Sequence, residues 1–147
     1  MNKIFLLLAT GFGIGYSKIM PGTVGSLIGL PIAYFFLQIS LISQIILSIF
    51  FIIFAIIISD KSSKIMSKKD PSCIVIDEYL TIPITIIGLS HPLYIFSGFI
   101  FHRIFDIIKP SFISKSQKLP GGLGIVIDDV LSALIALILN YIIYLSL

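Results

Sequence analysis

Charged residues are scarce in this sequence. Asp, Glu, Lys and Arg together make up only 12% of its 147 residues, whereas 57% are hydrophobic and the mean hydropathy is +1.12. A soluble domain usually has about 25% charged residues, so this chain cannot present most of its surface to water. The composition therefore indicates an integral membrane protein.

Cysteine and histidine are also rare, and each shortage excludes a kind of site. A single cysteine, Cys73, allows neither an intrachain disulfide nor a multi-cysteine metal site. The two histidines, His91 and His102, have no partner at a spacing suited to zinc. The net charge is only +3 and the lysine-rich loop has no interleaved aromatic residues, so no nucleic-acid partner is expected.

Long apolar segments fill most of the chain and predict an all-α membrane protein that forms a single domain, 1–147. Residues 39–59 contain no charge and are long enough to cross a bilayer, and residues 123–147 form a second long apolar helix. The segment 24–38 is short for a full span. Residues 81–101 are interrupted by Ser90-His91-Pro92, which favours a short, broken, re-entrant hairpin.

Residues 10–26, TGFGIGYSKIMPGTVGS, hold five glycines and Pro21, and we expect little regular helix over much of this span. The glycine spacing does not fit the dinucleotide-binding fingerprint. Where such a segment enters a helix, it offers free backbone N–H groups to an anion. The hydroxyls of Thr23 and Ser26 and the charge of Lys18 would assist. A flexible loop between two apolar segments is an equally good interpretation.

Five of the seven acidic residues lie in apolar sequence near the ends of predicted membrane segments: Asp77, Glu78, Asp106, Asp128 and Asp129. Isolated carboxylates so close to hydrocarbon would protonate unless a cation joined them. Carboxylates with almost no histidine are typical of a site for a hard, oxygen-preferring metal such as Mg²⁺. These acids therefore predict a magnesium site.

The only arginine, Arg103, lies three residues before Asp106, which lies three residues before Lys109. On a helix these three side chains share a face. A structural ion pair would explain Arg103 and Asp106 alone. Combined with a divalent cation and the amides of the Gly-rich segment, the two basic residues instead indicate a phosphate site and phosphoryl transfer.

These groups can form one site only if all of them lie at the same membrane face. Residues 27–59 can cross and return, the broken hairpin also returns, and the last helix crosses once. Lysines beside apolar segments mark the cytoplasmic side, and Lys61, Lys64, Lys68 and Lys69 therefore place the site on the cytoplasmic face.

Four motifs in register resemble the phosphatidylglycerophosphatase A family: PGTVGS at 21–26, IVIDE at 74–78, FHRIFDIIKP at 101–110 and GGLGIVIDD at 121–129. The resemblance covers essentially the whole chain. It implies a mostly helical, Mg²⁺-dependent lipid phosphatase of the bacterial inner membrane. Such an enzyme removes the terminal phosphate of phosphatidylglycerophosphate and leaves phosphatidylglycerol in the bilayer.

With this resemblance we expect Asp77, Asp128 and Asp129 to bind Mg²⁺, and Glu78 or Asp106 to orient water or act as the base. Attack by a carboxylate to form an acyl-phosphate is the open alternative. The groups expected to hold the phosphate are basic residues and the helix start: Arg103, Lys109, Lys18, Gly22, Thr23 and Ser26.

Two other classes of protein compete with this hypothesis. A small cation transporter or channel subunit could use the intramembrane carboxylates, as transporters do. It would need neither Arg103 nor the Gly-rich segment, and its acids would be expected near the bilayer midplane. A non-catalytic membrane scaffold would tolerate neutralisation of all five acids. The position of the acids at segment ends favours the phosphatase.

Overall fold

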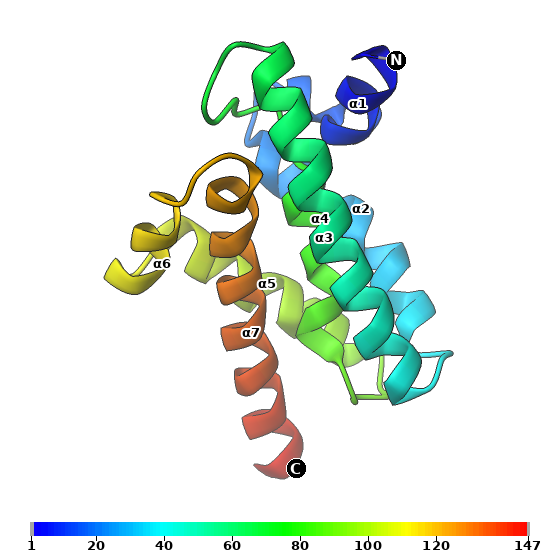
Figure 1. The fold of residues 1–147 in the computed structure, drawn as a ribbon. Helices are drawn as coiled ribbons and strands as arrows, with labels where there is room; N and C mark the ends of the chain where they lie inside the picture. The colour runs from blue at the N-terminus through cyan, green and yellow to red at the C-terminus, as the bar shows by residue number, and fades with distance from the viewer. Residues whose placement is uncertain (1, 147) are drawn as a thin grey trace.

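The computed structural model describes residues 2–146, and these form helices with no strand among them (Figure 1). The α-helices are α1 (Asn2–Ala9), α2 (Pro21–Phe36), α3 (Leu41–Ile65), α4 (Ile76–Thr81), α5 (Leu93–Ile108), α6 (Ser111–Ser116) and α7 (Gly122–Ser146). Two 3₁₀ helices join them, η1 (Ile14–Tyr16) and η2 (Ile82–Ile86). The predicted all-α fold is confirmed for this part of the chain.

The two longest helices, α3 and α7, each have 25 residues and are apolar enough to cross a membrane. At a rise of about 1.5 Å per residue, each is longer than the roughly 30 Å hydrocarbon core of a bilayer. Both long segments expected from the sequence are therefore helices of spanning length. Helix α3 continues past Ser59 through Lys61 and Lys64 and ends before Lys68 and Lys69.

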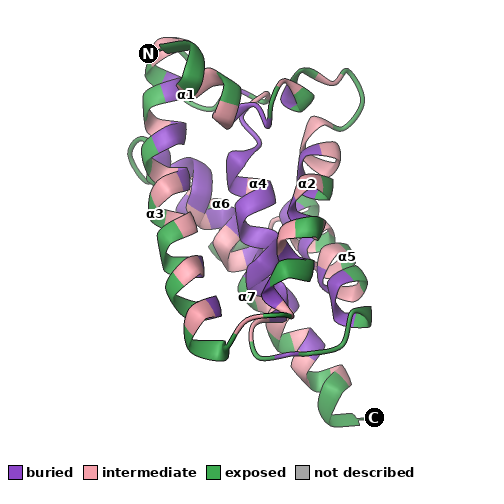
Figure 2. Ribbon diagram, turned by 90° about the vertical axis from the view of Figure 1, so that its right-hand side faces the viewer, coloured by how far each residue is buried: buried purple, intermediate pink, exposed green. Residues whose placement is uncertain are grey.

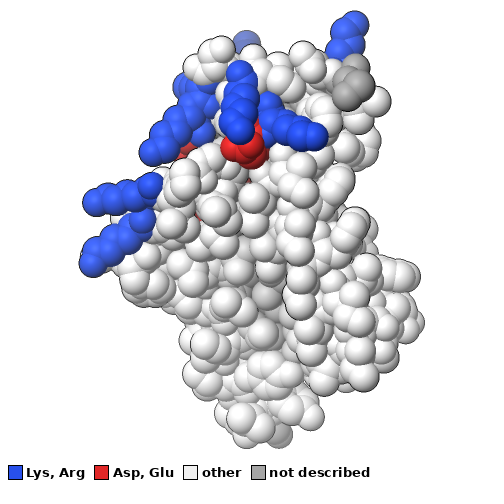
Figure 3. Space-filling view, in the orientation of Figure 1, with Lys and Arg blue, Asp and Glu red and all other residues white. Residues whose placement is uncertain are grey.

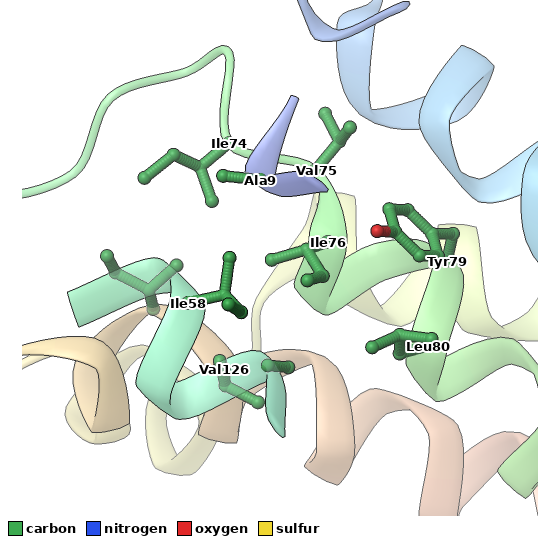
Figure 4. Packing of buried hydrophobic residues seen from close by; sticks show 10 residues of the cluster. Ala9, Ile58, Ile74, Val75, Ile76, Tyr79, Leu80 and Val126 are labelled. Carbon is green, nitrogen blue, oxygen red and sulfur yellow. The ribbon is translucent and has the colours of Figure 1, made fainter. Parts of the chain in front are cut away.

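The short helix α4 is the buried centre of the fold and packs against α2, α3 and α7 (Figure 2). Figure 4 shows Ile76, Tyr79 and Leu80 of α4 packed near Ile58 of α3 and Val126 of α7. The Tyr79 hydroxyl also donates a hydrogen bond of 2.9 Å to the backbone carbonyl of Leu8. Contacts on every side fix the orientation of α4, and with it the two acids in its first turn.

The expected interruption near residues 90–92 is present. Helix α4 leads directly into the buried 3₁₀ helix η2, in which Pro83 cannot donate a backbone hydrogen bond. The chain then turns at Gly88, whose φ of 78° suits glycine, and α5 begins after Pro92. The segment is thus two short helical pieces, and neither α4 with η2 nor α5 reaches the length of α3 or α7.

The expectation of little regular helix holds for residues 10–20, where the one helical element is the three-residue η1, but it is wrong for residues 21–26. Helix α2 begins at Pro21, because proline at the first helical position loses no hydrogen bond and already has a helical φ. The two glycines in this part are helical too. Glycine suits these positions because a Cβ at Gly22 would collide with the Glu78 carboxylate and one at Gly25 with Val75. Glycine here allows α4 to pack closely on α2.

One end of the molecule carries most of its charge. Figure 3 shows Lys and Arg gathered near one end of the visible face, with a long uncharged surface below them. At this end α3 and α7 are joined by Asp60, which accepts a hydrogen bond of 3.3 Å from the backbone nitrogen of Gly122. Asp60 also pairs with Lys64 at 2.6 Å. This contact fixes the start of α7 against α3.

Candidate active site

A cavity of about 390 Å³ opens where α2 and α7 begin and α5 ends, a size typical of small-ligand sites. Its lining includes every acidic and basic residue of the four sequence motifs: Asp77, Glu78, Arg103, Asp106, Lys109, Asp128 and Asp129. Helix α4 contributes two of them, α5 and its C-terminal cap three, and α7 two. The predicted convergence of the three acidic groups is thus found.

One side of the cavity, formed by α5 and by Glu78 of α4, is held together by Arg103. Its Nη1 lies 2.8 Å from Asp106 Oδ2 and 3.7 Å from Glu78 Oε2. The same atom donates to the Ser26 hydroxyl at 3.4 Å. Arg103 therefore crosslinks α2, α4 and α5, and its Nε is buried without a partner. The sequence interpretation of an ion pair with Asp106 is correct but incomplete.

Lys109 joins this paired side to α7. Its Nζ lies 2.7 Å from Asp128 Oδ2 and 3.4 Å from Asp106 Oδ1. The backbone of Lys109 is left-handed, with φ of 43°, and it ends α5 just before Pro110. Gln117, which follows α6, donates a second hydrogen bond of 2.9 Å to Asp128 Oδ2. Asp128 Oδ2 therefore accepts hydrogen bonds from both Lys109 and Gln117.

The other side of the cavity, formed by α7 and by Asp77 of α4, is not satisfied. Asp77, Asp128 and Asp129 each have a buried Oδ1 atom with no hydrogen-bond partner. The nearest histidine nitrogen, Nε2 of His102, is 3.9 Å from Asp129 Oδ1. Leaving a buried polar atom unpaired costs about 1–3 kcal/mol, so these three acids must be completed by a proton shared between carboxyl groups, by water or by an ion.

These unpaired oxygens suit a hard metal ion by chemical type, because Mg²⁺ prefers carboxylate oxygen and retains water ligands. Residues 2–146 nevertheless hold no group of three or more His, Cys, Asp or Glu side chains already placed to coordinate an ion. Among the buried or half-buried groups lining the cavity, five carboxylates face two cations. If all were ionised, three negative charges would remain uncompensated (five minus two), which is an electrostatic reason for a cation to bind.

The start of α2 forms another wall of the cavity. Gly22 and Thr23 line it, and Thr23 Oγ1 is buried with no partner. Ser26 lies behind them and contacts Glu78 Oε2 at 3.4 Å. Lys18 is exposed and is absent from the cavity lining, so the structure does not bring it to the other candidate phosphate-binding groups.

Glu78 and Asp77 point to different partners, as expected for neighbours on a helix. Asp77 lies with the unpaired oxygens, whereas Glu78 lies against Ser26 and Arg103. Burial raises the pKa of Glu78 to about 7, even though Arg103 opposes this increase. A carboxylate with such a pKa can gain or lose a proton near neutral pH, as a general base must.

Sequence reasoning missed three residues at or beside the site. Neither Gln117, which donates to Asp128, nor the exposed Asp70, which lines the cavity, is among the predicted site residues. His102 is fully buried, and its Nε2 lies 3.2 Å from the Thr81 hydroxyl. Thr81 donates to the carbonyl of Asp77, so its oxygen is free to accept from His102. The signal available in the sequence was that polar side chains are rare in so apolar a chain, so each of them is a candidate for the site.

The fold and the site together define a helical protein with an acid-rich cavity, also lined by Arg103 and Lys109, at the charged end of long apolar helices. Comparison with known proteins is more specific. The model of the family described as phosphatidylglycerophosphatase A matches residues 7–144. The chain belongs to the phosphatidylglycerophosphatase A family.

Named relatives cover nearly the whole chain. It is 35% identical to phosphatidylglycerophosphatase A of Escherichia coli, over 92% of this chain and 81% of that protein. It is 36% identical to phosphatidylglycerophosphatase A of Haemophilus influenzae, over 96% of this chain and 88% of that protein. A Bacteroides thetaiotaomicron protein with the provisional name phosphatidylinositol-3-phosphatase is 32% identical, over 91% and 89%. No solved structure matches at a significant level.

Proposed function

We propose that this protein is a phosphatidylglycerophosphatase, which hydrolyses the terminal phosphate of phosphatidylglycerophosphate to give phosphatidylglycerol. Two of its relatives carry that name. The observation that carries the proposal is the convergence of Arg103 and Lys109 with five carboxylates in one cavity at the start of α2. Two cationic side chains can bind a phosphomonoester. The acids beside them can bind a metal ion and accept a proton.

We assign the phosphate to Arg103, Lys109 and the first turn of α2. The guanidinium of Arg103 matches the geometry of phosphate oxygens, and its unpartnered Nε remains available for one of them. Gly22 and Thr23 supply free N–H groups at a helix N-terminus, where anions are favoured. Ser26 supports Glu78 and Arg103 from behind.

We assign Mg²⁺ to Asp77, Asp128 and Asp129, the residues with unpartnered buried oxygens. A bound ion at such a site polarises phosphoryl oxygens and lowers the pKa of water. Glu78, with a pKa of about 7, is placed to accept a proton from the attacking water. Asp106 orients the two cations, with its Oδ2 at 2.8 Å from Arg103 Nη1 and its Oδ1 at 3.4 Å from Lys109 Nζ. We place it between the phosphate assigned to Arg103 and Lys109 and the Mg²⁺ assigned to Asp77, Asp128 and Asp129.

In this proposal the whole chain, 1–147, forms one multi-pass domain in the bacterial inner membrane. The length and apolar composition of α3 and α7 support bilayer crossing. The lysines at the end of α3 and in the loop after it support a cytoplasmic position for the site, because positive residues stay on that side. The cavity would then open at the level of the lipid headgroups.

The cation-transporter alternative is less well supported. The acids gather at one end of the fold beside two cations, rather than along a path near the middle of the long helices. The related proteins are also named as phosphatases.

Phosphate release from defined lipids tests the proposal. The purified protein in mixed micelles should release phosphate from phosphatidylglycerophosphate when Mg²⁺ is present, and EDTA should abolish the release. Phosphatidylinositol 3-phosphate should be a much poorer substrate. If that lipid is hydrolysed faster, the substrate assignment is wrong and the provisional name of the Bacteroides relative describes this chain better. Ion flux in proteoliposomes without phosphate release would favour the transporter.

A further inference from the structure

A second cavity, of about 440 Å³, lies between α2 and α5. It is lined by Leu30, Pro31 and Tyr34 of α2 and by Pro92, Ile95 and Phe96 at the start of α5. None of these residues is charged, and the Tyr34 hydroxyl is the only polar side-chain group among them. The cavity is therefore suited to a hydrocarbon chain rather than to a headgroup.

This apolar cavity is built by the same two helices that hold the phosphate side of the active site. Helix α2 carries Thr23 at the active-site cavity, and helix α5 carries Arg103 there. Residues 23, 27, 30 and 34 share one face of α2, because they are spaced by three or four positions. Residues 103, 99, 96 and 92 share one face of α5 for the same reason.

The apolar cavity lies at matching depths along both helices. Leu30 and Tyr34 are seven and eleven residues after Thr23, and Phe96 and Pro92 are seven and eleven residues before Arg103. At about 1.5 Å per residue, the cavity lies roughly 10–17 Å from the phosphate-binding groups along either helix. The helices run in opposite chain directions, so the two cavities are separated by a similar distance along each helix.

Apolar side chains cover the distance between the cavities. Leu27 of α2 and Ile100 of α5 are exposed, and Phe99 is half-buried. Helix η2 packs against both α2 and α5, and its own side chains are fully buried beneath them. In phosphatidylglycerophosphate a glycerol and a phosphodiester separate the terminal phosphate from the acyl chains. With that phosphate at Arg103, the acyl chains would therefore begin at about the depth of the second cavity.

We propose that the apolar cavity between α2 and α5 is an acyl-chain subsite, which receives one acyl chain of the phospholipid whose terminal phosphate is bound at Arg103. This inference rests on the proposed function for the identity of the headgroup. The subsite gives a reason for selecting a membrane lipid over a soluble phosphomonoester, because a soluble phosphomonoester has no acyl chain to occupy it.

Kinetics with and without acyl chains provide the first test. Leu30→Trp should raise KM for long-chain phosphatidylglycerophosphate several-fold, because the indole fills the cavity and excludes the acyl chain. KM for a headgroup analogue without acyl chains, glycerophosphoglycerophosphate, should be unchanged. Ile138→Trp, at an exposed position of α7, is the control and should change neither value. Equal KM values for Leu30→Trp and wild type on both substrates would overturn the subsite.

Photocrosslinking provides a second test that does not depend on turnover. A photoreactive phenylalanine analogue replaces Phe96, which is 62% exposed, or Ile138, which is 59% exposed. In phosphatidylcholine vesicles with a small share of phosphatidylglycerophosphate, position 96 should capture the phosphomonoester lipid well above its share. Position 138 should capture lipids in proportion to the membrane. Proportional capture at both positions would refute the subsite.

The two tests separate failure of the subsite from failure of the proposed function. If the wild-type protein hydrolyses neither substrate, the proposed function fails, and enriched capture at position 96 still supports a lipid subsite. If Leu30→Trp loses activity on both substrates equally through misfolding, crosslinking in the otherwise native chain decides. If the wild-type protein is active but position 96 captures lipids only in proportion to the membrane, the proposed function stands and the subsite is wrong.

Discussion

The two sides of the active-site cavity are built on opposite principles. On the paired side, Arg103 and Lys109 satisfy Asp106 at 2.8 and 3.4 Å and approach Glu78 and Asp128. On the unpaired side, an oxygen of each α7 acid and one of Asp77 remain buried without a partner. The ion pairs of the paired side stabilise the fold without a ligand. The buried, unpartnered oxygens of the unpaired side lower the stability of the fold until a cation or another partner binds. Unsatisfied buried groups of this kind are typical of functional sites.

The largest effect is expected on the unpaired side, from Asp129→Asn. Losing a metal-ligand charge should lower kcat for phosphatidylglycerophosphate by about 10³-fold, since a bound ion contributes several kcal/mol to the transition state. The thermal unfolding midpoint in detergent should stay equal or rise, because a buried unpaired charge is removed. Full activity of Asp129→Asn would disprove the metal assignment.

Glu78→Gln should lower kcat by about 10²-fold, the usual contribution of a general base. Glu78 lies on the paired side, against Arg103 and Ser26, and the amide of glutamine keeps its shape and its contact with Ser26. Binding of a non-hydrolysable phosphonate analogue, measured by calorimetry, should therefore change little. A large loss of binding with unchanged kcat would instead make Glu78 a part of the phosphate-binding group.

On the paired side, Arg103→Lys should lower kcat/KM by about 30-fold, since lysine retains the charge but loses a charge-assisted hydrogen bond to phosphate. Unlike Asp129→Asn, this variant should also unfold at a lower temperature. The Nη1 atom that joins Asp106, Glu78 and Ser26 is lost with the guanidinium. If the unfolding midpoint does not fall, Arg103 does not stabilise the three helices in the way described.

The smallest effect is expected from Gln117→Ala, which removes the 2.9 Å hydrogen bond to Asp128 but no charge. Supporting partners of metal ligands usually contribute 10- to 100-fold, and with Lys109 still bound to Asp128 we expect about tenfold. The measurement is the Mg²⁺ concentration that gives half-maximal phosphate release. Gln38→Ala, an exposed amide in the turn after α2, is the control and should leave this concentration unchanged.

The sequence was sufficient to predict the buried or half-buried charged residues of the cavity but not their pairing. Spacing alone indicated that Arg103, Asp106 and Lys109 share a face. It could not show that Lys109 contacts Asp128, because that contact depends on α6 turning the chain back towards α7. The hydrogen bond from Gln117 was hidden for the same reason.

The start of α2 was misjudged because glycine and proline were interpreted as helix breakers. In isolation that preference is correct. In the folded chain, Gly25 lets Val75 pack directly against the α2 backbone and Gly22 leaves room for the Glu78 carboxylate, and this packing outweighs the helix propensity. Lys18 was included among the phosphate-binding groups because of its nearness in sequence, but the turn before α2 leaves it exposed.

The close crossing at Gly122 determines which way the α7 acids face. A Cβ at Gly122 would collide with the backbone carbonyl of Ile56, so the first turn of α7 has a fixed rotation relative to α3. Each added residue turns a helix by about 100°. One residue inserted between Gly122 and Asp128 would therefore swing both carboxylates away from α4 without altering either of them, so the six-residue interval from Gly122 to Asp128 is as much a part of the site as the acids.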